Sequence, residues 1–246
     1  MEKKIKREPE RMFSHSIRGI VFDVDGTLYS ATALKCLMVL RLIGSGLKKP
    51  LSFGRLLKTI SSYRKAQEIL RRSGIREVDL KKKQIDLASS LADLDRETVR
   101  QTLDAWMEEI PLRYIPLSKR SGLKTVLRGL KRKGYRIGIF SDYPCEKKLE
   151  ALGIRSMVDA ASCSMDPDIG AFKPHPAGFR VIARKLGLSA RQIVYVGDRP
   201  DVDAAGALSA GMQAVLIRRF RNRYQHGIWH TTLGKVAESL PERKAQ

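Results

Sequence analysis

Short apolar runs alternate with helical stretches in two parts of the chain, and this alternation predicts an α/β fold. Five runs have the length and composition of buried strands, namely Gly19–Phe22, Tyr135–Phe140, Met157–Ala161, Ile193–Val196 and Ala214–Ile217. Helical patterns lie between and after these runs, at Ser121–Lys133, Glu146–Leu152, Pro176–Leu186, Val202–Ala210 and Thr232–Leu240. Strands that alternate with helices imply right-handed crossovers, so we expect a Rossmann-like three-layer core built on a mostly parallel sheet.

The segment from Ala31 to about Arg113 has a helical pattern throughout and no convincing strand. Apolar residues recur there at helical spacing, first at Leu34, Leu37, Met38 and Leu42. Two further helices are predicted at Leu80–Leu91 and Arg96–Glu109, with Asp95 as the N-cap of the second. This pattern predicts an all-helical insert in which the Leu34–Leu42 stripe forms the core.

Three segments follow from these patterns. Residues 1–18 form a basic, polar N-terminal tail, residues 31–113 form the helical insert, and residues 19–30 with 114–246 form the α/β core. A length of 246 residues with 43% hydrophobic content suits one sizeable domain that carries an inserted subdomain. No apolar stretch is long enough to span a bilayer, and the charged N-terminus lacks the apolar core of a signal peptide.

Three cysteines, Cys36, Cys145 and Cys163, are widely spaced and form no CxxC pair. They are expected to be reduced thiols in a cytoplasmic protein rather than metal ligands or disulfides.

The formal net charge of +21 is large and unevenly distributed. Ala31–Arg72 holds ten basic residues and one acidic residue, which gives this segment a charge of +9. A basic surface attracts phosphorylated or polyanionic partners, although a merely soluble surface has the same composition. The basic part of the insert, Lys35–Arg72, could face an acidic substrate or an anionic membrane, because the Leu34–Leu51 stretch is apolar. Nucleic acid is the less favoured partner, since aromatic residues make up only 7% of the chain and no binding motif is present.

The first predicted strand ends in the run Asp23-Val24-Asp25-Gly26-Thr27. Residues i and i+2 of a strand point to the same side, so Asp23 and Asp25 lie together at the carboxyl end of a buried strand. Open α/β sheets place their ligands at that edge. Two carboxylates at such close range repel each other unless a cation or a shared proton intervenes.

Three later segments end strands or begin helices with further polar residues. Tyr135–Phe140 is followed by Ser141 and Asp142, and Lys173 precedes a predicted helix in the run Lys173-Pro174-His175-Pro176. Ile193–Val196 is followed by Gly197 and then by the acidic residues Asp198, Asp201 and Asp203. A parallel sheet gathers such ends at one edge, and the collected groups suit a hard divalent cation together with an anion.

The order of these four motifs resembles that of the haloacid dehalogenase (HAD) superfamily, in its phosphatase branch. The first motif, DxDGT, is matched by Asp23–Thr27, the second by Ser141, the third by Lys173 and the fourth by Gly197-Asp198 through Asp203. The resemblance covers Arg18–Arg218, and the insert corresponds in position to a C1-type helical cap similar to that of phosphoglycolate phosphatases. Dehalogenases of the superfamily lack the second Asp of the first motif, so Asp25 favours phosphoryl transfer.

The resemblance also implies roles for individual residues. Asp23 is the nucleophile that forms an aspartyl-phosphate, and Asp25 is the general acid and base. The implied Mg²⁺ is held by Asp23, by the backbone carbonyl of Asp25, by Asp198 and by Asp203 or Asp201. The implied phosphate-binding residues are Ser141, Asp142, Lys173 and Thr27.

The resemblance implies hydrolysis of a small phosphorylated metabolite, and three alternatives stay open. They are a phosphoryl-transferring mutase, a phosphatase or binding protein that acts on nucleic acid, and a scaffold without catalysis. Some motif residues also have an ordinary structural interpretation. Ser141, Asp201 and Asp203 could each cap a helix, and His175 could lie in a turn that leads into a helix. Neither the substrate nor the oligomeric state has a signature in the sequence.

Overall fold

The computed structural model of the chain describes residues 13, 16–48, 50–217, 223–225 and 228–242. Its sheet has the order β3-β2-β1-β4-β5-β7-β6. The strands are β1 Gly19–Phe22, β2 Arg136–Ser141, β3 Ala160–Cys163, β4 Ile193–Gly197, β5 Gln213–Ile217, β6 Arg223–Gln225 and β7 Ile228–Thr231. All neighbours pair in parallel except β6 and β7, which pair antiparallel at the edge. The predicted α/β fold with a parallel sheet is confirmed.

Two strand predictions need correction. The run Met157–Ala161 contains the end of a 3-10 turn, Arg155–Met157, and the strand starts only at Ala160. The strands β6 and β7 were missed, because three and four residues are too few to show an alternating pattern. The position of β7 between β5 and β6 is decided by tertiary pairing, in which Ala214 of β5 lies opposite Ile228 of β7.

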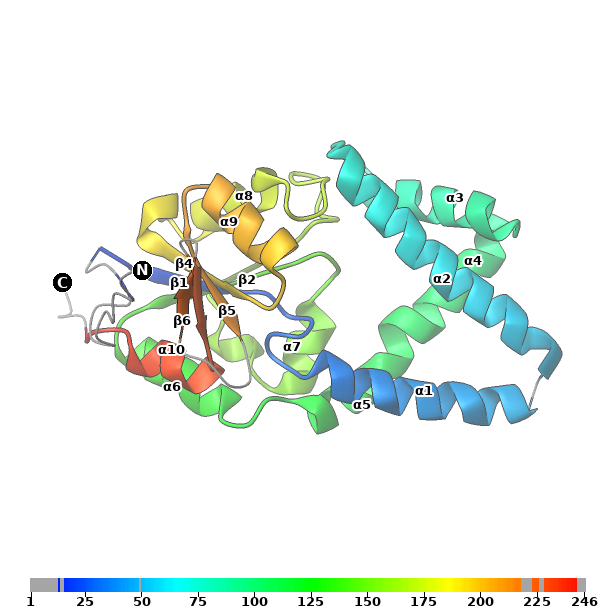
Figure 1. The fold of residues 1–246 in the computed structure, drawn as a ribbon, viewed down its shortest axis with the longest axis horizontal. Helices are drawn as coiled ribbons and strands as arrows, with labels where there is room; N and C mark the ends of the chain where they lie inside the picture. The colour runs from blue at the N-terminus through cyan, green and yellow to red at the C-terminus, as the bar shows by residue number, and fades with distance from the viewer. Residues whose placement is uncertain (1–12, 14–15, 49, 218–222, 226–227, 243–246) are drawn as a thin grey trace, which may run out of the picture.

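Helices cover both faces of the sheet (Figure 1). The core helices are α6 Leu123–Arg132, α7 Glu146–Leu152, α8 Pro176–Lys185, α9 Ala205–Ser209 and α10 Leu233–Glu238. On one face α6, α7 and α10 bury a cluster that includes Leu127, Leu149 and Val236. On the other face α8 and α9 bury a cluster that includes Phe179 and Ala207. The result is the predicted three-layer arrangement.

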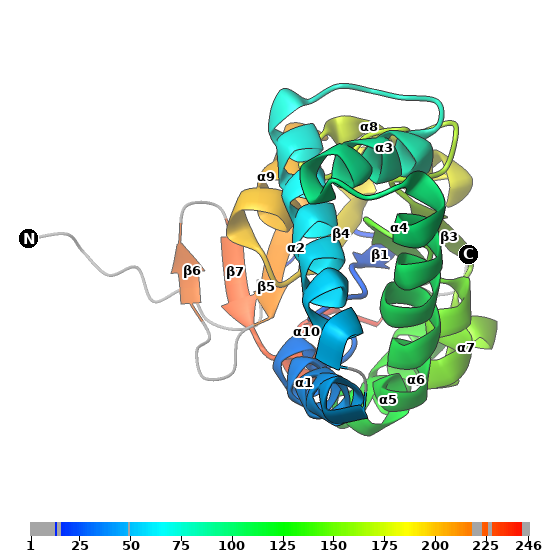
Figure 2. The ribbon, with the colours of Figure 1, turned by 90° about the vertical axis from the view of Figure 1, so that its right-hand side faces the viewer.

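In the described part of the chain, six α-helices and one π-helical turn lie between β1 and β2, and all of these except α6 make up the helical insert, or cap. The elements of the cap are α1 Ala31–Lys48, α2 Pro50–Ser73, α3 Leu80–Ala92, α4 Arg96–Leu103, the π-helical turn Asp104–Glu109 and α5 Ile110–Ser118. The predicted N-cap is confirmed, because the side chain of Asp95 accepts a hydrogen bond from the Thr98 backbone N–H at 2.8 Å. Viewed from the cap side, β1 and β4 are seen between α2 and α4, and α1 and α5 lie at the bottom of the view (Figure 2). The helical insert therefore faces the carboxyl ends of the central strands.

The cap core differs from the prediction. Its buried cluster joins α2, α3 and α4 through Tyr63, Ala66, Ala88, Val99 and Leu103. The stripe Leu34–Leu42 is not part of that cluster. Its members are only half-buried, and Leu34 packs against the core domain instead. The prediction was wrong because α1 lies at the side of the cap, where α2 and α5 are the described elements that pack most closely on it.

The structure can be compared with two of the predicted segments, the helical insert and the N-terminal tail. Residue 113 falls inside α5, so the division between cap and core at residues 113 and 114 stays a prediction. Most of the predicted N-terminal tail, residues 1–12 and 14–15, lies outside the described residues. Phe13 and Ile17 of that segment are buried in the core-domain cluster.

Candidate active site

The predicted site residues converge because β2, β1 and β4 are neighbours in the sheet. Asp23 follows the last residue of β1, Ser141 ends β2, and Asp198 follows the last residue of β4. Parallel pairing aligns these ends, with Phe22 opposite Ile139 on one side and Val196 on the other. The loop before α8 brings Lys173 to the same edge, where its ammonium contacts Asp23.

Lys173 is the centre of a buried network. Its Nζ donates to Asp23 Oδ1 at 2.6 Å, to Asp203 Oδ1 at 2.7 Å and to the Tyr195 hydroxyl at 3.2 Å. The Tyr195 hydroxyl in turn donates to the Phe140 carbonyl at 2.8 Å. Both carboxylates and the ammonium are almost fully removed from solvent. One lysine therefore holds the first and fourth motifs together.

Burial and charge act against each other in this network. Burial alone lowers the pKa of Lys173, but the carboxylates of Asp203 and Asp23 raise that pKa well above its ordinary value. Burial raises the pKa of Asp23 well above its usual range, and Lys173 opposes that rise. Burial and the neighbouring Asp203 also raise the pKa of Asp198. The lysine stays charged, while the surrounding acids carry more negative charge than this one cation offsets.

The structure separates the two acidic candidates of the fourth motif. Asp203 is buried, and its Oδ2 accepts the backbone N–H groups of Asp198 and Arg199 at 3.0 Å each. Asp201 is exposed and pairs with Arg199 at 2.6 Å. Asp203 therefore shapes the loop that presents Asp198, whereas Asp201 points to solvent.

Two glycines allow this close packing. Gly26 has a φ of +93°, and a Cβ there would lie 2.2 Å from Asp198 Oδ2. A Cβ on Gly197 would lie 2.4 Å from both Cβ and Cγ of Asp203. Both distances are far below van der Waals contact, so the loops after β1 and β4 approach each other only because side chains are missing.

Asp25 is partly exposed and has its own partners. The Nζ of Lys148 on α7 lies 2.7 Å from Oδ1 and 2.9 Å from Oδ2 of Asp25, and the Tyr29 hydroxyl donates to Oδ1. Burial pushes the pKa of Asp25 up, but Lys148 and the Tyr29 hydrogen bond outweigh it and lower that pKa. Asp25 is thus held ionised by two residues that the sequence analysis did not assign to the site.

The other predicted residues take distinct places. The Thr27 hydroxyl donates to Asp23 Oδ2 at 3.3 Å, and Ser141 is fully buried at the end of β2. Asp142 uses its carboxylate within the protein, because Oδ1 accepts the Lys173 backbone N–H at 3.0 Å and the Ser164 hydroxyl at 3.0 Å. His175 caps α8 by accepting the Ala177 backbone N–H, which agrees with its predicted role in the turn.

The cap contacts the core beside this network. Arg71 of α2 is almost entirely buried and donates to Asp142 Oδ2 at 2.7 Å, while its Nε has no hydrogen-bond partner. Arg76 donates to the carbonyls of Ile169 and Asp168 at 3.0 Å each, and the Glu77 N–H donates to the Gly170 carbonyl at 2.7 Å. The cap is therefore seated on the loops that follow β2 and precede α8.

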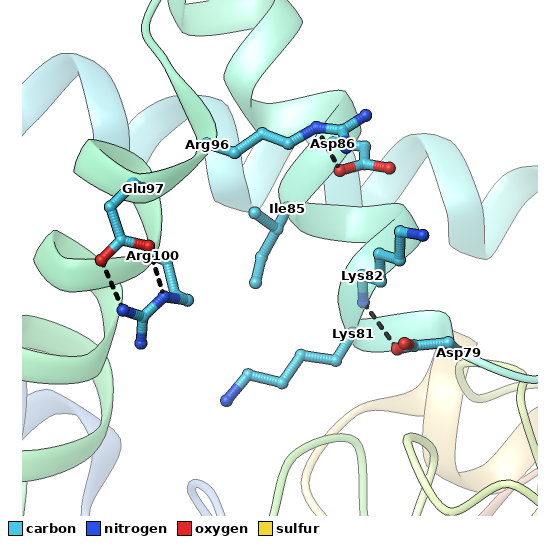
Figure 3. A pocket seen from close by; sticks show the side chains of 8 residues that line it. All are labelled: Asp79, Lys81, Lys82, Ile85, Asp86, Arg96, Glu97 and Arg100. Carbon is cyan, nitrogen blue, oxygen red and sulfur yellow. Dashed lines mark hydrogen bonds and ion pairs between the residues drawn. The ribbon is translucent and has the colours of Figure 1, made fainter.

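A surface hollow of about 340 Å³ lies elsewhere, between α3 and α4 of the cap (Figure 3). Two of its ion pairs are Arg96–Asp86 at 2.8 Å and Arg100–Glu97 at 2.5 Å, and Lys81 pairs with Glu108 at 2.8 Å. None of the catalytic candidates lines it, so the hollow is not part of the candidate active site.

The acidic residues fit a cation. Asp23, Asp198 and Asp203 each offer a carboxylate oxygen, and these oxygens lie within 4.8 Å of one another. Oxygen donors of this kind suit a hard divalent ion, and a cation placed among them would lower the raised pKa values of Asp23 and Asp198. The predicted metal residues that contribute side chains to this group are therefore Asp23, Asp198 and Asp203.

Four residues of the site environment were missed from the sequence. They are Tyr29, Arg71, Arg120 and Lys148. Arg120 donates to the carbonyls of Gly26 at 2.6 Å and Thr27 at 2.8 Å, and so fixes the loop after β1. Lys148 is the one of the four with a sequence signal, because the run from Lys148 to Gly153 also resembles the HAD superfamily. The others depend on contacts between distant segments.

Comparison with known proteins agrees with this geometry. A family model described as haloacid dehalogenase-like hydrolase matches residues 17–211. The glyceraldehyde 3-phosphate phosphatase of Methanopyrus kandleri is 32% identical over 219 residues, covering 85% of this chain and 86% of that protein. The phosphoglycolate phosphatase of Cereibacter sphaeroides (strain ATCC 17029) is 28% identical over 123 residues, covering 49% and 55%.

A solved structure shows the same fold over nearly the whole chain. The HAD phosphatase from Thermococcus onnurineus superposes with a TM-score of 0.63 at 24% identity, covering 93% of this chain and 100% of that one. The matched family region contains all four motifs, from Asp23 to Asp203. The chain belongs to the haloacid dehalogenase-like hydrolases, in the phosphatase branch that cleaves phosphoric monoesters.

Proposed function

We propose that the protein is a Mg²⁺-dependent phosphatase that hydrolyses a small phosphorylated metabolite through an aspartyl-phosphate on Asp23. The buried contact between Lys173 and both Asp23 and Asp203, with Asp198 beside them, carries the proposal. Such a cluster is costly to bury and contributes little to folding, so its value is catalytic.

In the first half-reaction Asp23 is the nucleophile. Lys173 and Thr27 hold its two carboxylate oxygens in place. Attack of a carboxylate oxygen forms a bond to phosphorus and breaks the bond between phosphorus and the ester oxygen. This step uses the protonated form of Asp25, which has to take up a proton beforehand and then donates it to the departing oxygen, so that the leaving group departs as an alcohol.

In the second half-reaction Asp25 is the base. Its carboxylate takes a proton from water while the water oxygen attacks phosphorus, and the bond between Asp23 and phosphorus breaks. Inorganic phosphate leaves, Asp23 is again a carboxylate, and Asp25 is again protonated. The pairing with Lys148 and Tyr29 favours the ionised form of Asp25, which this half-reaction requires.

We assign the remaining predicted residues to binding. Ser141 and Lys173 bind the phosphoryl oxygens, while Thr27 and Asp142 hold Asp23 and the Lys173 loop in position. The Mg²⁺ residues are Asp23, Asp198, Asp203 and the backbone carbonyl of Asp25. When bound, the ion neutralises the acids and withdraws charge from the phosphoryl group.

The substrate class follows from the relatives and from the cap. We infer a phosphorylated three-carbon or two-carbon compound, of the size of glyceraldehyde 3-phosphate or phosphoglycolate, because the matched relatives are named for these substrates. The contacts of Arg71 and Arg76 with the core support a small substrate, since they close the cap over the loop that carries Lys173.

The test is phosphate release from glyceraldehyde 3-phosphate, phosphoglycolate and p-nitrophenyl phosphate. We expect release with Mg²⁺, loss after treatment with EDTA and recovery when Mg²⁺ is returned. In water labelled with oxygen-18, the released phosphate should carry one labelled oxygen, which distinguishes hydrolysis from transfer to a second sugar. Absence of release from all three esters in the presence of Mg²⁺ would contradict the proposal.

A further inference from the structure

Helix α1 is apolar on both its inner and its outer side over residues 36–43, although it lies at the side of the cap. Seven of the eight residues from Cys36 to Ile43 are apolar, and Arg41 is the exception. A helix with this composition is normally buried on all sides. Among the described elements, however, only α2 and α5 pack closely on α1.

One face of α1 therefore stays uncovered. Leu34, Leu37, Met38 and Leu42 are half-buried on the inner side. On the opposite side Val39 is 51% exposed, Leu40 is 67% exposed and Ile43 is 51% exposed. Ile43 lies four positions after Val39 and three after Leu40, so these residues form one stripe on the helix surface. We call Cys36, Val39, Leu40 and Ile43 the α1 stripe.

The charge of the segment that carries the α1 stripe is of one sign. From Ala31 to Gln67 the chain has eight basic residues and no acidic residue. Lys35 and Arg41 on α1, and Arg55 and Lys58 on α2, are exposed. Lysine and arginine side chains are long, so their charged ends can reach past an apolar surface that a partner covers. The partner of this surface must accept apolar side chains and carry negative charge.

We propose that the α1 stripe and its basic neighbours dock the protein on an anionic lipid bilayer. An apolar helix face with flanking basic residues is the arrangement that lies in the headgroup region of such a membrane. A second copy of the chain would cover the stripe, but it would also bring the same basic residues against one another. A nucleic acid would satisfy the charge and leave Leu40 without an apolar contact.

The position of α1 agrees with docking. In Figure 1 it runs outward from the core domain along the edge of the cap, and Figure 2 shows it again at the edge of the molecule. No helix of the described residues is long and apolar enough to cross a membrane, so the contact is peripheral.

The test is co-sedimentation of the full-length protein with vesicles. Vesicles of phosphatidylcholine that contain about one third phosphatidylglycerol should bind the protein at low salt, and vesicles of phosphatidylcholine alone should bind it weakly. High salt should weaken the binding, and each of the substitutions Lys35→Gln and Arg41→Gln should weaken it about fivefold.

A triple variant tests the apolar half of the surface. Val39→Gln, Leu40→Gln and Ile43→Gln together should reduce binding to anionic vesicles by about tenfold or more. The matched control is Leu208→Gln, because Leu208 is 42% exposed on α9 of the core domain and lies outside the stripe. Hydrolysis of p-nitrophenyl phosphate in solution should be unchanged in all of these variants, so failure of docking and failure of the enzymatic activity are measured separately.

Three results would overturn the docking proposal. The first is equal binding to neutral and anionic vesicles, or binding to neither. The second is a wild-type dimer in sedimentation equilibrium that the triple variant converts to a monomer, since a second copy then covers the stripe. The third is salt-dependent binding to duplex DNA or RNA, without vesicle binding, that the triple variant retains.

Discussion

The ammonium of Lys148 contacts both carboxylate oxygens of Asp25, at 2.7 and 2.9 Å. Lys148 lies on α7, more than 120 residues along the chain from the DxDGT motif. The contact links the general acid and base to a helix of the core domain. It also provides a direct way to change the proton affinity of Asp25 without changing its carboxylate.

Replacement of Lys148 by methionine should raise the pKa of Asp25, because the opposite charge that favours its ionised form is removed. The half-reaction that needs ionised Asp25 should then lose rate at low pH, so the acidic limb of the kcat profile should move to higher pH. The measurement is kcat against pH. Lys147→Met is the matched control, because Lys147 is exposed on the same helix, and its profile should coincide with that of the wild type.

The same contact predicts how folding stability depends on pH. The pKa of Asp25 is lower in the folded protein than in the unfolded chain, where it is about 3.9. The pair therefore stabilises the fold above about pH 4, and this stabilisation is lost as pH falls through the lower folded pKa. Urea unfolding of the wild type and Lys148→Met should show that their difference shrinks in acid. A difference that grows on acidification would show the opposite linkage.

Asp23→Asn should abolish turnover, because an amide does not form the acyl phosphate. The fold should be retained, since the amide has the same size, and circular dichroism checks this point. Asp201→Asn is the control, because Asp201 is exposed and pairs only with Arg199 among the described contacts. We expect activity near that of the wild type for the control. Near-wild-type turnover of Asp23→Asn would refute the assignment of the nucleophile.

Lys173→Met should destabilise the protein by about 3–5 kcal/mol, because two buried carboxylates lose their shared cation. Added Mg²⁺ should recover part of that stability by supplying positive charge to Asp23 and Asp198. Thermal unfolding with Mg²⁺ and with EDTA measures both effects. A variant as stable as the wild type in EDTA would show that the network contributes nothing to folding.

Gly26→Ala should weaken activation by Mg²⁺, because its new methyl group would lie 2.2 Å from Asp198 Oδ2 and displace that carboxylate. The matched control is Gly122→Ala, where φ is +73° but no atom lies within 4 Å of the added methyl. In both variants an alanine has to adopt a left-handed backbone conformation, which lowers the folding stability by about 1 kcal/mol. Only Gly26→Ala should raise the Mg²⁺ concentration for half-maximal rate, and equal responses of the two would argue against the contact.

Arg71→Ala should loosen the contact between cap and core, because Arg71 joins α2 to Asp142 beside the Lys173 loop. We expect a higher KM for the metabolite and faster hydrogen exchange in residues 168–175. Arg72→Ala should change neither quantity, because Arg72 is exposed at the next position of the same helix. If KM and hydrogen exchange stay unchanged in Arg71→Ala, the cap is held by other contacts.

The sequence by itself determined the alternating α/β core, the helical insert and the four motifs. Those patterns are local, since a buried strand and a helix each show their period within a few residues. It also determined that Asp23, Ser141 and Asp198 share one edge, because the carboxyl ends of parallel strands must meet there. The order β2-β1-β4 then places these three strand ends side by side.

Only the tertiary structure decided which side chains touch. The choice of Asp203 over Asp201 depends on burial against β4, and the contacts of Lys148 with Asp25 and Arg71 with Asp142 join segments far apart in the chain. The exposed α1 stripe belongs here too, because its apolar spacing is the same as that of a core helix. A pattern of apolar residues predicts that one face of a helix is buried. Which element or partner buries that face is decided by packing in three dimensions.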